Sequence, residues 1–172
     1  MANPEQATAQ RAMDAPFELS VERHIAAPSA ALWSIMTDRI TEWWCPRPWT
    51  TTIGKLEWRS GGAFHLVMRG PDGEADCQGE ESVGGVLLEF EPGHRFVFTD
   101  AFSAGWEPRK PFMVGSFAIE PDGDGTRYRA SARHWTAEAM EEHRKMGFDD
   151  GWGKVAEQLA ALAEGVDAQT SD

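Results

Sequence analysis

The chain has 172 residues, of which 41% are hydrophobic and 26% are charged. This balance is typical of a globular protein, and the length fits one domain with one core. The formal net charge of −12 argues against binding to nucleic acid or anionic lipid, because both need clustered Lys and Arg. Eight tryptophans accompany one tyrosine, which indicates either a heavy aromatic core or an aromatic-lined pocket.

Cellular location is predicted from what the sequence lacks. The two cysteines, Cys45 and Cys77, have no CxxC or Cys/His spacing of a metal site. No run of about 18 apolar residues is present, and residues 1–16 have no apolar core of a signal peptide. We therefore expect a cytoplasmic protein with reduced thiols and no membrane span.

Composition also predicts where the folded domain begins and ends. Residues 1–15 are polar and are expected to be a disordered tail, residues 16–165 to form a single domain, and residues 166–172 to form a polar C-terminal tail. From Phe17 onward apolar and polar residues alternate, which predicts a half-buried strand. Pro28 favours the start of a helix that runs to Thr37, and a second short helix is predicted over 40–44.

The middle of the chain has the hydrophobic period of strands. Gly61-Gly62 predicts a hairpin turn, and Gly84-Gly85 indicates a bulge or bend. The predicted strands cover residues 55–58, 64–68, 86–90, 95–100, 112–120 and 126–134.

The last part of the chain is predicted to be helical. Thr136 is the expected N-cap, and the helical region ends near Glu164, before Gly165. An apolar stripe with 4-3-4-3 spacing predicts one buried face: Phe148, Trp152, Val155, Leu159 and Leu162.

Glycines interrupt this last helix. A break is expected near Gly147, which would give a short helix followed by a long one. Each glycine inside a helix costs about 1 kcal/mol relative to alanine. We interpret Gly151 and Gly153 as small residues that leave a cavity between the helix and a curved sheet.

The order of these elements resembles the START-like (SRPBCC) superfamily, specifically proteins similar to the C-terminal domain of the activator of the heat-shock chaperone ATPase. The resemblance covers residues 17–164. It rests on the segments Arg23-His24-Ile25-Ala26-Ala27-Pro28, Leu32-Trp33, Gly61-Gly62-Ala63-Phe64, Gly79 to Glu91, Gly125-Thr126, Met146-Gly147-Phe148 and Gly151-Trp152 with Leu159.

This resemblance implies an α+β helix-grip fold. A curved antiparallel sheet of six to seven strands would wrap around the long C-terminal helix, with two short helices after the first strand and an apolar cavity between sheet and helix. Relatives include lipid binders, cyclases and a chaperone-activating domain, so the fold alone does not select a function.

We expect a protein, monomeric or homodimeric, that binds a small apolar or amphipathic molecule without a cofactor. Trp43, Trp44 and Trp49 would form a pocket wall or ordinary lid packing, and Trp106 a mobile gate or an exposed ring on a solvated hairpin. The candidate ligand-binding residues are Trp43, Trp44, Trp49, Phe64, Met68, Phe98, Trp106, Phe117, His134, Met146, Gly151 and Trp152.

Two histidines are the candidates for catalysis. His134 and His143 could act as general bases in a cyclase-like or hydratase-like enzyme, since imidazole titrates near neutral pH. They could equally be hydrogen-bonded or exposed side chains without a chemical role. Together with Glu138 they are conceivable metal ligands, but the sequence contains no metal-binding motif. We therefore expect no bound metal.

A third possibility is a protein partner. Acidic residues without a basic neighbour extend from Asp72 to Glu91, which indicates either a solvated edge or a docking surface for a chaperone or another basic protein.

Overall fold

The computed structural model describes residues 16–75 and 84–165. The two expected tails lie outside these ranges, as do Cys77 and part of the acidic stretch. Within them the elements are β1 (Glu18–Ile25), α2 (Ser29–Asp38), the 3-10 helix η1 (Ile40–Glu42), β2 (Thr50–Leu56), β3 (Ala63–Arg69), β4 (Gly85–Glu91), β5 (Arg95–Thr99), β6 (Phe102–Ser103), β7 (Glu107–Pro108), β8 (Val114–Asp122), β9 (Gly125–Arg133), α3 (Ala137–Lys145) and α4 (Phe148–Glu164).

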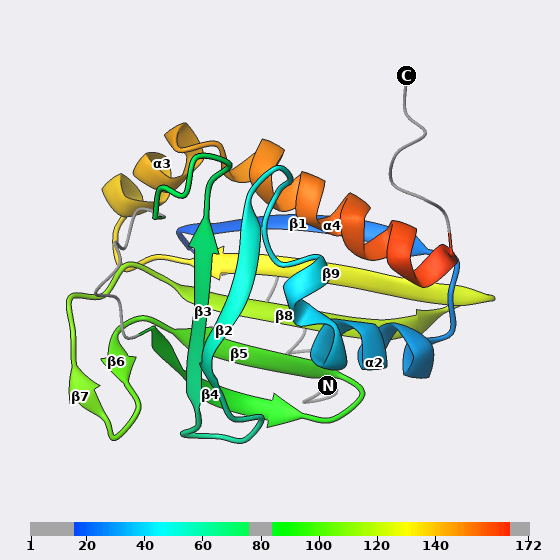
Figure 1. Cartoon of the computed structure of the whole chain (residues 1–172), viewed down its shortest axis with the longest axis horizontal. Coiled ribbons are helices and arrows are strands. Elements are labelled where there is room, and N and C mark those ends of the chain that lie inside the picture. Colours follow the sequence, from blue (N-terminus) through cyan, green and yellow to red (C-terminus); the bar gives the residue numbers. More distant parts are fainter. Residues whose placement is uncertain (1–15, 76–83, 166–172) are drawn as a thin grey trace, which may run out of the picture.

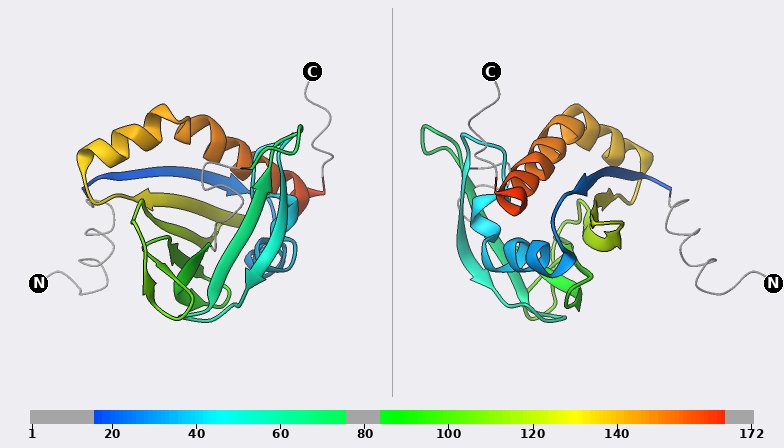
Figure 2. Two further views of the ribbon diagram at one scale, coloured as in Figure 1. Left: turned by 60° about the vertical axis from the view of Figure 1, so that its left-hand side comes forward. Right: turned by 90° about the vertical axis from the view of Figure 1, so that its right-hand side faces the viewer.

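Seven strands form one antiparallel sheet in the order β1-β9-β8-β5-β4-β3-β2. The sheet curls into a half-barrel, and α4 runs along its open side beside β1 (Figures 1 and 2). Register shifts between Ile53 and Lys55 in β2 and between Leu87 and Glu89 in β4 mark irregularities of the kind that increase strand bending. The predicted helix-grip architecture is confirmed, with seven strands where six to seven were expected. The strand predicted over 55–58 is displaced toward the N-terminus, since β2 runs from Thr50 to Leu56.

The helical elements also follow the sequence signals. The Thr136 hydroxyl accepts a hydrogen bond from the Ala139 N–H at 3.1 Å, as an N-cap does. Gly147 has φ +95° and separates α3 from α4, which confirms the predicted break. The sequence analysis did not predict β6 and β7, which form a separate two-stranded sheet.

Strand alternation decides which face of the sheet is buried. In β9, Tyr128, Ala130 and Ala132 are fully buried toward the helices, whereas Arg127 and Arg133 are exposed on the other face. The core therefore lies between the concave face of the sheet and the helices α2 and α4.

Candidate functional site

Aromatic rings fill the space between the sheet and α4. The ring of Phe117 in β8 stacks on Phe96 at 5.0 Å between centroids and on Trp152 of α4 at 5.5 Å. The rings of Trp43 and Trp44 contact Phe117 at 6.0 Å and 5.0 Å. The volume beneath the last helix, where a cavity was predicted, is thus occupied by side chains, since rings at these separations are in contact.

The glycines of α4 do not create space between this helix and the sheet. A Cβ atom at Gly151 would find its nearest neighbour in Pro46, 4.0 Å away, and one at Gly153 would meet nothing within 4 Å. Pro46 belongs to the connection between η1 and β2, not to the sheet. Our interpretation of these glycines is therefore wrong, because Trp152 between them is the residue that contacts the sheet.

Open space remains to one side of the ring cluster. A recess of about 90 Å³ is lined by Trp44, Phe64, Leu66, Met68, Gly84, Gly85, Phe98, Asp100 and Met113, and we call it the lateral recess. A cavity of about 150 Å³ binds benzene, and one water takes about 30 Å³ of the liquid, so this recess fits a short alkyl group.

A close approach at a glycine and contacts between the rings fix the aromatic side chains of the lateral recess. The Phe98 ring crosses β8 at Gly115, where a Cβ atom would lie 2.4 Å from Phe98 Cε1. Phe98 stacks on Phe64 with centroids 4.6 Å apart. Trp44 completes the wall, 5.3 Å from Phe64 and 5.8 Å from Phe98. A glycine at position 115 is therefore required for this arrangement.

A buried glutamine of α4 holds the segment that carries Trp44. Gln158 donates from Nε2 to the carbonyl oxygen of Cys45 at 2.8 Å, and its Oε1 accepts from the Arg47 N–H at 2.9 Å. The Thr51 hydroxyl lies 2.9 Å from Cys45 Sγ, and burial raises the pKa of the Cys45 thiol. These contacts fix the backbone on one side of Trp44.

Asp100 is the one charged residue among the described residues that line the lateral recess. Its Oδ1 accepts hydrogen bonds from the N–H groups of Phe112 at 2.9 Å and Met113 at 3.2 Å. Within the part of the chain that the structure describes, its Oδ2 makes no hydrogen bond. The carboxylate is thus held in one orientation while one of its oxygens keeps its capacity to accept.

The two candidate catalytic histidines form a buried pair. His134 Nε2 lies 2.9 Å from His143 Nδ1, and His134 Nδ1 lies 2.9 Å from the carbonyl oxygen of Phe17. A carbonyl only accepts, so His134 Nδ1 donates, and a neutral His134 then accepts the Nδ1–H of His143 at Nε2. The pair thereby connects the start of β1, the end of β9 and α3.

Aromatic side chains surround this pair. The ring of His143 lies 5.1 Å from those of Phe112 and Phe148. Burial, and to a lesser extent the neighbouring His134, lowers the pKa of His143 to about 4. His143 is therefore neutral at pH 7, and neither histidine is among the residues that line the lateral recess.

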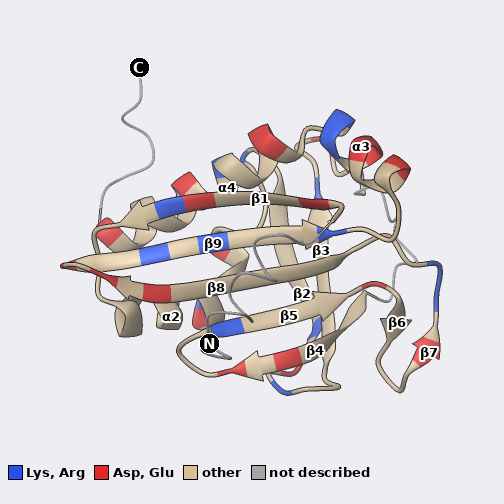
Figure 3. Cartoon of the chain, turned by 180° about the vertical axis from the view of Figure 1, so that it is seen from behind, with Lys and Arg blue, Asp and Glu red and all other residues tan. Residues whose placement is uncertain are grey.

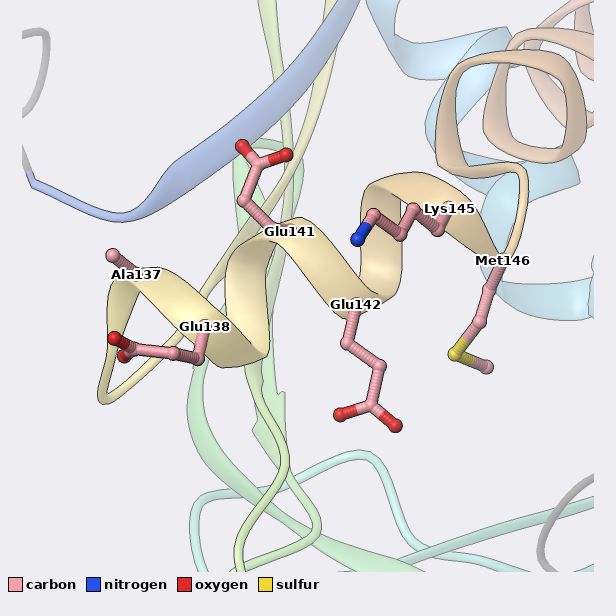
Figure 4. A pocket seen from close by; sticks show the side chains of 6 residues that line it. All are labelled: Ala137, Glu138, Glu141, Glu142, Lys145 and Met146. Atoms are coloured by element: carbon pink, nitrogen blue, oxygen red, sulfur yellow. The ribbon is translucent and has the colours of Figure 1, made fainter.

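Three other candidate ligand-binding residues lie away from the lateral recess. Trp49 is half-buried and does not line it. Trp106 is 54% exposed between β6 and β7, where its ring contacts Phe102, in agreement with the exposed-hairpin alternative. Met146, 55% exposed, borders a shallow depression of about 550 Å³ over α3 whose other lining residues include Glu138 and Glu142 (Figure 4).

The outer face of the sheet carries charges of both signs (Figure 3). Arg95 pairs with Glu89 at 2.7 Å and with Glu91 at 3.4 Å, so one positive charge offsets part of the negative charge at the end of the acidic stretch. Arg129 pairs with Glu18 on the same face. Among the residues that the structure describes, no three His, Cys, Asp or Glu side chains are placed to hold a metal ion. In the same ranges no helix has the length and apolar character needed to cross a bilayer.

The sequence analysis did not include several residues that the structure brings to the lateral recess or to its frame. Leu66 could have been proposed from strand alternation with Phe64 and Met68. Gln158 had a signal as well, since it is a polar residue beside Leu159 on the apolar side of the last helix. Asp100 had none.

Comparisons with known proteins identify relatives of this fold. The family model described as "Activator of Hsp90 ATPase homolog 1-like protein" matches residues 26–164. A crystal structure of a protein from Nitrosomonas europaea is 31% identical, covers 86% of this chain and 94% of its own, and has a TM-score of 0.77. A protein from Mycobacterium smegmatis is 22% identical over 91% of this chain and 93% of its own, with a TM-score of 0.68. No protein with a curated description matches the chain.

Proposed function

Since the chain belongs to the family of Activator of Hsp90 ATPase homolog 1-like proteins, we propose that it is a non-catalytic binding protein that holds a small apolar group in the lateral recess. The observation that carries this proposal is the wall of the recess. Three aromatic rings, those of Trp44, Phe64 and Phe98, surround open space of about 90 Å³ that the core does not fill.

The frame of the recess supports this proposal. A site binds well when its walls are held in the bound arrangement before the ligand arrives. Phe98 is fixed by its stack on Phe64 and by the absence of a side chain at Gly115. Trp44 is fixed by the segment that Gln158 holds on α4.

The enzymatic alternative has weaker support. A cyclase-like or hydratase-like reaction needs a base within hydrogen-bonding reach of the substrate. Neither His134 nor His143 lines the lateral recess, and the low pKa of His143 makes it a weak base. We therefore place the binding role first.

A titration with isopentyl alcohol, a neutral branched alkyl probe, tests the proposal. In ¹H–¹⁵N spectra of the full chain, the indole N–H signal of Trp44, assigned with Trp44→Phe, should shift in a saturable way. Met68→Trp should abolish the shift, because the larger ring fills the recess. Met146→Trp is the matched control, since Met146 is exposed on another surface.

Two results would contradict the proposal. One is the absence of a saturable shift in the wild-type protein, and the other is an unchanged affinity in Met68→Trp. If Met68→Trp does not fold, Leu66→Phe provides a second variant that reduces the same space.

A second candidate function is contact with a chaperone. It is favoured by the description of the matching family and by the net charge of −12. The test is a binding measurement with a chaperone middle domain at low and high salt, because an electrostatic contact weakens as salt increases. Absence of binding at low salt would rule this candidate out.

A further inference from the structure

Asp100 gives the lateral recess a chemical preference. Among the described residues that line the recess, the other eight are apolar or glycine, so Asp100 supplies the one charged side chain there. The two N–H groups that bond Oδ1 come from the backbone and fix the direction of the carboxylate. Oδ2 is left to accept from a ligand.

We infer that the ligand of the lateral recess is a small organic cation, with a short alkyl group between the rings and a primary ammonium group at Asp100. The inference rests on the proposed function, because it names the ligand class of the same site. The group of the ligand that donates to Asp100 is thus a positively charged ammonium, and not a neutral hydroxyl or a carboxylate.

Three physical effects favour a cation over a neutral or anionic ligand. Hydrogen bonds between an ammonium group and a carboxylate are stronger than those between neutral groups. The faces of Trp44, Phe64 and Phe98 attract a cation that comes close to them. The net charge of −12 raises the local concentration of cations and repels anions.

The basic residues that follow β7 do not occupy this position. Arg109 follows β7, and its N–H donates to the Ala101 carbonyl oxygen at 2.8 Å, so its backbone runs beside the residue after Asp100. The side chains of Arg109 and Lys110 are exposed, and neither forms an ion pair with a described residue. The carboxylate is therefore available to a ligand.

An isosteric series of probes tests the inference. Isopentylamine, isopentyl alcohol and isovalerate share one alkyl group and differ in the group that would face Asp100. Titrations monitored by the Trp44 indole signal should give an affinity about tenfold higher for the amine than for the alcohol, as expected for a hydrogen bond between charged groups. Isovalerate should bind most weakly.

Asp100→Asn separates the charge from the shape of the site. Asparagine keeps an oxygen that can accept from Phe112 and Met113. The variant should therefore keep the shape of the recess and lose the preference for the amine over the alcohol. Asp124→Asn, in the exposed turn between β8 and β9, removes the same charge elsewhere and should leave the preference intact. If Asp100→Asn does not fold, added salt should weaken the binding of the amine but not that of the alcohol.

The outcomes distinguish this inference from the proposed function. Equal affinities for amine and alcohol, or a preference that persists in Asp100→Asn, would overturn the cationic ligand while leaving an apolar site. Failure of all three probes to bind would overturn the proposed function itself.

Discussion

Trp152 of α4 and Phe117 of β8 stack with their ring centroids 5.5 Å apart and their planes 15° from parallel. This contact closes the space between helix and sheet at the point where related folds are expected to be hollow. The lateral recess lies beside Trp44 and is lined by residues of β3, β4 and β5. This aromatic pair therefore occupies the space beneath α4 and leaves the lateral recess as the place where we propose that a ligand binds.

The glycines of α4 can be replaced without loss of stability. Gly151→Ala and Gly153→Ala should each stabilise the protein by about 0.5–1 kcal/mol, because alanine favours the helix and its Cβ meets no atom closer than 4.0 Å. Chemical denaturation measures the change. Gly147→Ala is the control and should destabilise by about 1 kcal/mol, since Gly147 has φ +95°. A loss of stability in both helix variants would show that these positions have a packing role.

The buried histidine pair predicts a loss of stability in acid. The pKa of His143 falls from about 6.5 in the unfolded chain to about 4 in the folded protein, so the unfolded state binds more protons between these values. The contribution of His143 to the free energy of unfolding is complete above pH 6.5 and should decrease by up to about 3 kcal/mol toward pH 4.

Denaturant melts between pH 7 and pH 4 measure this dependence. His143→Gln cannot titrate, yet its amide can still donate to His134, so its stability should fall less steeply with pH. His94→Gln, at an exposed position, is the control and should retain the wild-type slope. Equal slopes for all three proteins would mean that His143 does not contribute.

The glutamine of α4 is predicted to be a major stabilising residue. Gln158→Leu should destabilise the protein by about 2–4 kcal/mol, because it leaves the Cys45 carbonyl and the Arg47 N–H without their partner. The indole signal of Trp44 should also shift as its segment loosens. Glu157→Leu removes an exposed neighbour and should change stability by less than about 1 kcal/mol. A small effect of Gln158→Leu would argue against this role in positioning Trp44.

The fold was predictable because its signals are local. Strand alternation, the Thr136 cap and the glycine break at Gly147 each depend on a few neighbouring residues. The rings that fill the interior were also named from the sequence, including Phe117 and Trp152.

The site was less predictable because its position depends on contacts between distant segments. Whether rings surround a space or fill it is set by pairs such as Trp44 and Phe98, which are 54 positions apart. The orientation of Asp100 depends on the backbone of Phe112 and Met113, which no pattern around residue 100 reveals.

A crystal under xenon pressure tests the central claim most directly, because xenon binds in apolar cavities without needing a polar partner. We predict a xenon atom in the lateral recess, among the rings of Trp44, Phe64 and Phe98. A xenon atom beneath α4 between Phe117 and Trp152, or none in the recess, would contradict the account.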